Sequence, residues 1–224
     1  MVAITLSADA PVVSLDGTRV TANTPEGIAA IEEFRKIIAH PGQVPANEVW
    51  SGAWGSADTA VSTGLAAMCW TGNWSFGIME ENGIDYMSIP APIVPGGQPR
   101  AGSYINCLVV PESSANKEAA WTFIQWALSK EGQVSFASFS DSPVNDEAAD
   151  IVAAERNAEN QDGFGAFNIG ERYPYASLPT DFNMMWDEMI EDLQLGTITA
   201  AEFAERLESE GQPMIDEYLA NIAR

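Results

Sequence analysis

The chain has 224 residues, of which 46% are hydrophobic, enough to build the core of one large domain or two small ones. Its 32 acidic side chains outnumber 10 basic ones, so the formal net charge is −22. Nucleic acids and anionic membranes are bound through basic surfaces, and this charge balance argues against both as partners. The acidity itself predicts a soluble protein of a salty or extracellular medium.

The first half of the chain predicts short helices that alternate with apolar strands. Asp16-Gly17 indicates a hairpin turn, and Thr24 followed by Pro25 indicates a helix N-terminus. Apolar residues at helical spacing continue that helix to about residue 38. Beyond it, the pattern predicts short helices at 57–63 and 74–81 and strands at 65–70, 85–92 and 104–111.

The second half is predicted to be mostly helical. Helices are expected over 117–128, near 130–139 and around 146–158, followed by an ordered loop over 164–180. The helix that starts at 181 carries one apolar face, and Thr199 with Glu202 forms a capping box for the next helix. Gly211 and Pro213 are expected to interrupt that helix before the last segment. Together with the strands of the first half, this pattern favours an α/β fold.

Catalytic and metal-binding motifs are not found in the sequence. His40 is the one histidine, so any Ser-His-Asp or Cys-His system would have to use it, and no motif surrounds it. With Cys69 and Cys107 the inventory is too small for a Cys/His metal site. We therefore predict no catalytic residue, no cofactor and no metal. Paired carboxylates are abundant in so acidic a chain, which leaves a carboxylate-pair glycoside hydrolase as an open alternative.

Seven tryptophans are a high number for this length. Trp121 and Trp126 lie in an amphipathic helix and are typical of core packing. Most of the other five lie at loop edges or helix starts, beside Gly, Ser or Asn: Trp50, Trp54, Trp70, Trp74 and Trp186. A flat indole suits the apolar face of a pyranose ring, and nearby polar groups suit its hydroxyls. The group predicts carbohydrate binding, although core packing stays an alternative for each tryptophan.

Three segments resemble one protein family. GLAAMCWTGNWSFGIMEENGIDYMSIPAP (64–92) resembles a pattern of Gly-x-Ala-Ala-Met, Gly-x-Trp, a helix and a strand ending in Pro. The segment AGSYINCLVVPESSANKEAAWTFIQWALSKEGQ (101–133) resembles the glycine-rich strand and the Asn-Lys-Glu-Ala-Ala-Trp helix that follow in the family. The segment DGTRVTANTPEGIAAIEEFRKI (16–37) resembles the upstream Val-x-x-Asn-(Ser/Thr)-Pro-Glu segment. The motifs occur in the family's order over about residues 12–215. The chain therefore resembles the extracellular solute-binding proteins of bacterial ABC sugar importers, similar to maltose-binding protein.

The resemblance implies an α/β fold of the type II periplasmic-binding-protein kind, with a short central sheet flanked by helices. Residues 1–102 and 172–224 would form the C-terminal ligand-binding lobe. Residues 103–171 would form the hinge crossing and a segment of an incomplete N-terminal lobe. The helices over 117–139 would then have an uncovered apolar face, which either a missing N-terminal lobe or self-association would cover.

The resemblance also assigns ligand contacts. Trp74 would stack on a sugar ring from the start of a helix, with Asn73 beside it and Gly72 allowing a close backbone approach. Trp186 matches the region of a second aromatic contact. The glycine-rich crossing of Gly102, Ser103 and Tyr104 would line the cleft, and Trp54 and Asp58 fall where a further contact is expected.

The implied function is binding of a sugar or oligosaccharide and its delivery to the membrane subunits of an ABC importer, without catalysis. The implied location is periplasmic or extracellular with a membrane anchor, although residues 1–13 do not have the pattern of a signal peptide. Alternatives are a solute-binding protein for another ligand, such as a peptide, a polyamine or an anion, or the glycoside hydrolase above.

Overall fold

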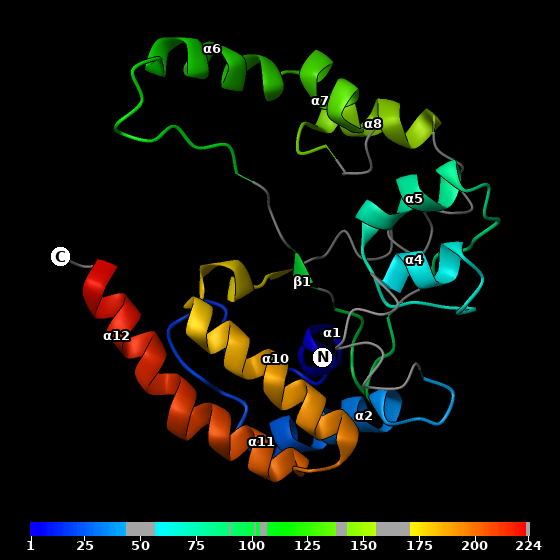
Figure 1. The fold of residues 1–224 in the computed structure, drawn as a ribbon, viewed down its shortest axis with the longest axis vertical. Helices are drawn as coiled ribbons and strands as arrows, with labels where there is room; N and C mark the ends of the chain where they lie inside the picture. The colour runs from blue at the N-terminus through cyan, green and yellow to red at the C-terminus, as the bar shows by residue number, and fades with distance from the viewer. Residues whose placement is uncertain are drawn as a thin grey trace. The chain divides into compact units, whose positions relative to one another are not determined.

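The structure is a computed structural model that describes residues 1–43, 57–89, 91–100, 102–103, 107–137, 143–155 and 171–222. Its internal contacts group the chain into two compact units (Figure 1). Unit 1 comprises Met1–Ala53, Pro90–Tyr104 and Phe167–Arg224, and unit 2 comprises Trp54–Ile89 and Ile105–Ala166. Residues 54–89 thus group with residues 105–166. The family resemblance instead assigns residues 54–89 to the same lobe as residues 1–53. The predicted lobe boundaries stay a prediction.

Unit 1 consists mainly of helices that pack around one hydrophobic core. Its elements are α1 (Val2–Ser7), α2 (Pro25–Ile38), β1 (Gly102–Ser103), β2 (Glu171–Arg172), η2 (Pro174–Ser177), α10 (Thr180–Leu195), α11 (Ala200–Arg206), the π-helical turn η3 (Leu207–Gly211) and α12 (Gln212–Ile222). In Figure 1, α10, α11 and α12 run from golden yellow through orange to red at the end of the chain, and α11 packs against the blue α2.

Local signals in unit 1 form the turns and caps that the sequence predicts. The Thr24 hydroxyl accepts a hydrogen bond of 3.0 Å from the Gly27 N–H, with Pro25 at the first helical position of α2. Thr199 and Glu202 form the predicted capping box of α11. Gly17 adopts a φ of 74° in the hairpin, and the Ser14 N–H donates to the Arg19 carbonyl at 2.8 Å. These predictions are confirmed.

The core of unit 1 forms where the apolar faces of α1, α2, α10 and α11 meet. Its aromatic centre is Trp186, whose ring packs edge-on against Phe182 at 5.8 Å and Tyr173 at 6.4 Å between ring centroids. The Tyr173 hydroxyl accepts a hydrogen bond from the backbone N–H of Val13 at 3.3 Å. The largest fully buried side chains are Trp186, Phe182, Phe203, Ile4, Leu6, Ile31, Met189, Leu193, Leu207, Ile215, Val12 and Val13.

The sequence predicts that Gly211 and Pro213 interrupt the last helix, and this prediction is wrong. The chain stays helical from Ala200 to Ile222, with one π-helical turn at 207–211. A Cβ atom at Gly211 would lie 2.6 Å from Phe182 Cε2 and 3.0 Å from Met185 Cε. The glycine therefore lets the π-helical turn approach α10 closely.

We expect Gly211→Ala to lower the free energy of unfolding by about 1–3 kcal/mol, because the added methyl group overpacks the core against Phe182. Urea denaturation followed by circular dichroism measures this. The control is Ser209→Ala, which removes an exposed hydroxyl in the same π-helical turn and should change the stability little. If Gly211→Ala and Ser209→Ala changed the stability equally, Gly211 would not be required for the close approach of the π-helical turn to α10.

Unit 2 contains α4 (Ala57–Ser62), η1 (Asn73–Ser75), α5 (Phe76–Glu81), α6 (Lys117–Ala127), α7 (Lys130–Ala137) and α8 (Asp146–Glu155). Helix α4 packs against α5, and α7 packs against both α6 and α8. Its described core is small: Ala60, Phe76, Met79, Ile124, Ala127, Ala148 and Val152. Unit 2 therefore leaves much apolar surface in contact with solvent.

The predicted central sheet does not form within the described ranges. The strands expected at 65–70, 85–92 and 104–111 are extended or irregular wherever the structure describes them. The regular pairing present is parallel, between the two-residue strands β1 and β2, with Gly102 opposite Glu171 and Ser103 opposite Arg172. A strand needs a hydrogen-bonded neighbour, and the extended segments take part in no sheet among the residues described. Their apolar side chains, Leu65, Met68, Met87, Leu108 and Val109 among them, are exposed.

Candidate functional site

Trp74 lies on a tight turn that opens a helix, as the sequence predicts. The turn is η1, and the Ser75 N–H closes it by donating to the Gly72 carbonyl at 3.1 Å. Helix α5 follows directly and is anchored by buried Phe76 and Met79. Phe76 also stacks on Tyr86, with 5.5 Å between ring centroids and 24° between planes. Trp74 is 48% exposed, so a well-anchored turn holds a half-exposed indole.

Gly72 is the residue that lets the indole adopt this position. A Cβ atom at Gly72 would collide with the Cζ3, Cη2 and Cε3 atoms of the Trp74 ring. The indole therefore lies directly across the backbone of Gly72. The sequence attributes this glycine to a close approach by ligand, whereas here the close approach is made by the tryptophan itself.

Under this turn lies a buried polar chain. The Ser75 hydroxyl lies 3.1 Å from the Asp58 Oδ2 atom and 2.6 Å from the Thr71 hydroxyl. The Asp58 Oδ1 atom accepts a further hydrogen bond of 3.0 Å from the Thr59 N–H. Asp58 is only 5% exposed. Its carboxylate thus bonds inside unit 2 in this structure instead of facing solvent as a ligand contact would.

Thr71 and Ser75 were not assigned a role from the sequence. Their hydroxyls flank the Gly72–Trp74 segment on both sides, at positions four apart. That spacing within a turn lets two side chains meet, so it is the signal from which their pairing could have been inferred.

Cys69 lies close to the same network. Burial, and secondarily the charge of Asp58, raises the pKa of its thiol above the usual value. Cys107 is an exposed free thiol. The thiolate is the reactive form of cysteine, so a raised pKa slows modification at a given pH.

We expect iodoacetamide at pH 8 to alkylate Cys107 well before Cys69, because Cys69 is partly buried and its raised pKa keeps it protonated. Peptide mass spectrometry over a time course measures both sites. Asp58→Asn should speed the reaction at Cys69, since it removes the nearby negative charge. Alkylation of both cysteines at one rate, in this variant and in the parent, would contradict the described environment.

The remaining predicted contacts lie in several places. Trp186 is 2% exposed in the core of unit 1, where packing on Tyr173 and Phe182 leaves no access for a sugar ring in this structure. The assignment of Trp186 to ligand stays a prediction, which this burial does not favour. Gly102 and Ser103 form strand β1 of unit 1. Asn73 is described as part of the η1 backbone. Trp54 and Tyr104 lie outside the described residues.

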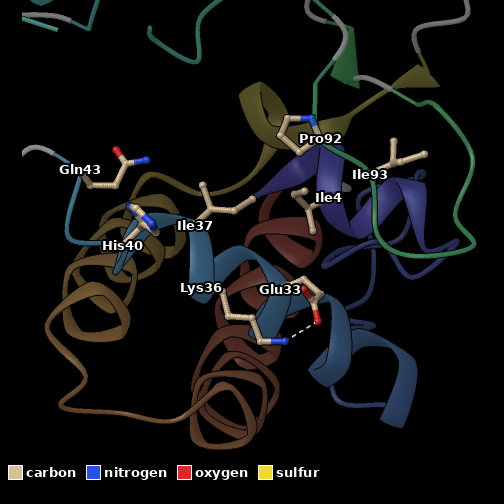
Figure 2. Close-up of a pocket in the computed structure, with 8 residues that line it drawn as sticks. All are labelled: Ile4, Glu33, Lys36, Ile37, His40, Gln43, Pro92 and Ile93. Atoms are coloured by element: carbon tan, nitrogen blue, oxygen red, sulfur yellow. Dashed lines mark hydrogen bonds and ion pairs between the residues drawn. The ribbon is translucent and has the colours of Figure 1, made fainter. Parts of the chain in front are cut away.

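A shallow pocket of about 300 Å³ lies in unit 1. Figure 2 shows Glu33, Lys36 and Ile37 on α2 and His40 just beyond its end, with Ile4, Pro92, Ile93 and Gln43 as the other lining residues. Lys36 pairs with Glu33 at 2.6 Å, and His40 Nδ1 accepts from the Gly42 N–H at 3.0 Å. None of these eight lining residues is Trp, Tyr or Phe, so the pocket lacks the stacking surface that the sequence predicts for a sugar.

The family model for bacterial extracellular solute-binding proteins matches residues 2–134 of the chain, more than half of its length. This chain belongs to the bacterial extracellular solute-binding proteins. The family is one of transport proteins and not a class of enzymes, and its name implies a periplasmic or extracellular location. Across the part of the chain that is described, no helix is long and apolar enough to cross a membrane.

The solute-binding fold is also found by comparison with solved structures. The chain resembles an ABC transporter solute-binding protein from Thermotoga lettingae TMO, crystallised with bound alpha-D-tagatose. The TM-score is 0.73 at 16% sequence identity. The match covers 96% of this chain but 55% of that protein, so the chain spans about half the length of this relative. No curated protein sequence matches the chain.

This solute-binding protein shows no metal-binding group in its described part, where no three His, Cys, Asp or Glu side chains gather closely enough to hold an ion. The candidate site that the sequence predicts around Trp74 consists, in the described residues, of the exposed indole on its turn and the polar chain beneath it.

Proposed function

We propose that this chain is the ligand-binding part of a sugar-binding protein that delivers its ligand to an ABC importer, with Trp74 as a wall of the sugar site. The observation that carries the proposal is the half-exposed Trp74 indole laid across Gly72 on an anchored turn. An aromatic side chain buries a large area at little entropic cost when its position is fixed beforehand. A sugar ring presents the flat apolar face that such an indole fits.

The relative from Thermotoga lettingae supports a sugar as ligand, because it was crystallised with a ketohexose. We propose that the complete protein has the two-lobed type II fold and closes around the sugar, and that membrane subunits of the importer bind the closed form. A membrane anchor outside the described residues would hold it near the importer. Asn73, Gly102, Ser103, Tyr104 and Trp54 are proposed as the polar and aromatic contacts that complete the site.

The test is calorimetric titration of the complete two-lobed protein with D-tagatose, maltose, spermidine and a tripeptide. We expect saturable binding of at least one of the two sugars and none of spermidine or the peptide. The sugar should be recovered unchanged after incubation, since a solute-binding protein does not hydrolyse its ligand. Binding of the polyamine or peptide alone, or release of reducing sugar from maltose, would overturn the proposal.

Helices α6 and α7 carry an exposed apolar face that another part of the complete protein could cover. Phe123, Trp126 and Phe136 form a contiguous group, with 5.8 Å and 5.9 Å between successive ring centroids. Trp121 and Leu128, like these three, are exposed. We propose that this face is covered by the region of the solute-binding fold that the chain does not contain, since the match leaves 45% of the relative without a counterpart. A second copy is disfavoured because each chain carries a net charge of −22.

We expect the 224-residue chain to bind a hydrophobic dye such as ANS, and the complete two-lobed protein to bind little of it, because the α6–α7 face is then covered. Fluorescence titration measures the dye, and light scattering on the same samples measures the mass. Trp126→Glu should reduce dye binding by the isolated chain. A chain that forms a dimer and binds no dye would show instead that a second copy covers the face.

A further inference from the structure

The turn that carries Trp74 is held by more than its own backbone. The Gly72 carbonyl and Ser75 N–H close it, but two hydroxyls and a carboxylate also join its ends to α4. Ser75 is the N-cap residue of α5, a position at which serine usually accepts from the helix backbone. Here its side chain makes no such capping bond and is turned to Asp58 instead.

The direction of the hydrogen bonds in this chain follows from the groups themselves. An ionised carboxylate accepts only, so the Ser75 hydroxyl donates its single hydrogen to Asp58. Ser75 then has no hydrogen left for Thr71, and the Thr71 hydroxyl must donate to Ser75. The chain therefore has one arrangement, from Thr71 through Ser75 to Asp58. Ser75 and Asp58 are 2% and 5% exposed, so water does not compete with it.

We propose that Asp58, Ser75 and Thr71 are positioning residues that fix the orientation of the Trp74 indole for ligand. Trp74 lies between Thr71 and Ser75 in sequence, so the bond between those hydroxyls closes a loop around it. Asp58 ties that loop to α4, which packs on α5. This inference rests on the proposed role of Trp74 in sugar binding. It replaces the direct ligand contact that the sequence predicts for Asp58.

The first experiment needs no ligand. The chain is labelled with 5-fluorotryptophan, and the Trp74 signal among the seven is assigned by its loss in Trp74→Phe. We expect Thr71→Val, which keeps the shape but removes the hydroxyl, to shift or broaden the ¹⁹F signal of Trp74. Thr71→Ser keeps the hydroxyl and should leave that signal in place. Ser75→Ala is a second test at the centre of the chain, should Thr71→Val fold poorly.

The second experiment measures affinity of the complete protein for D-tagatose. Thr71→Val should weaken binding about tenfold, within the range seen for coupled neighbours, and Thr71→Ser should restore it. If the network only fastened α4 to α5, Thr71→Val and Ser75→Ala would lower the melting temperature without moving the Trp74 signal, and the inference would be overturned. Should the parent protein bind neither D-tagatose nor maltose, the proposed function fails, while the ¹⁹F signal still decides the positioning role.

Discussion

Trp74→Ala is expected to abolish sugar binding by the complete protein while leaving its fold intact. The indole is 48% exposed and contributes little to the core of unit 2, whereas a stacked aromatic at the centre of a site is typically worth about 2 kcal/mol or more, roughly thirtyfold in affinity. Calorimetric titration gives the affinity, and circular dichroism with thermal melting checks the fold. Trp74→Phe should keep part of the affinity because it retains an aromatic face, but Trp74→Leu should not.

Gly72→Ala tests the same prediction with a second variant. Its methyl group would occupy the space of the indole, so Trp74 must move even though it is still present. We expect a large loss of affinity here as well. Unchanged affinity in Trp74→Ala would show that the sugar does not stack on this residue, and equal affinities for the Phe and Leu variants would show that any apolar side chain suffices.

Phe182→Ala is expected to have the largest effect on stability, a loss of about 3–5 kcal/mol in the free energy of unfolding of unit 1. The Phe182 side chain is fully buried, lies edge-on to Trp186 and fills the space beside Gly211. Removing its ring leaves a cavity between α10 and the π-helical turn that the surrounding helices cannot fill. Urea denaturation monitored by far-ultraviolet circular dichroism measures the change.

Met184→Ala is the matched control, two residues along the same helix. Met184 is exposed, so its truncation should change the stability by about 0.5 kcal/mol or less. A similar loss in both variants would mean that α10 does not bury the face described here.

The helices of unit 1 could be predicted because their signals are local. Thr24 and Thr199 cap α2 and α11 within their own segments, and Gly196 ends α10 with a φ of 74°. Helix α1 was missed because it has none of these signals. It has no side-chain cap, and its Thr5 and Ser7 are buried through hydrogen bonds that the sequence does not reveal.

The strands could not be predicted in the same way, since pairing is not local. Residues 65–70 have the composition of a buried strand, but a strand forms only where a neighbour supplies hydrogen bonds and covers its faces. Exposed Met68 and Val109 show that the described part of the chain leaves these faces uncovered.

Of the candidate site, the turn at Trp74 could be predicted, and the Asp58 partner beneath it could not. The Asp58–Ser75 contact joins residues 17 apart in the chain, and no short-range pattern identifies it. Trp186 shows the opposite case. Its spacing from Phe182 and Met189 already indicates the buried face of a helix, whereas the ligand contact was implied by the family resemblance alone.

The central claim is that an indole on an anchored turn forms one wall of a sugar site. A crystal structure of the complete protein with D-tagatose or maltose bound tests it most directly. We predict the sugar ring lying parallel to the Trp74 indole, in van der Waals contact, with Asp58 still bonded to Ser75 beneath it. A sugar bound elsewhere, with Trp74 packed away from it, would contradict the account.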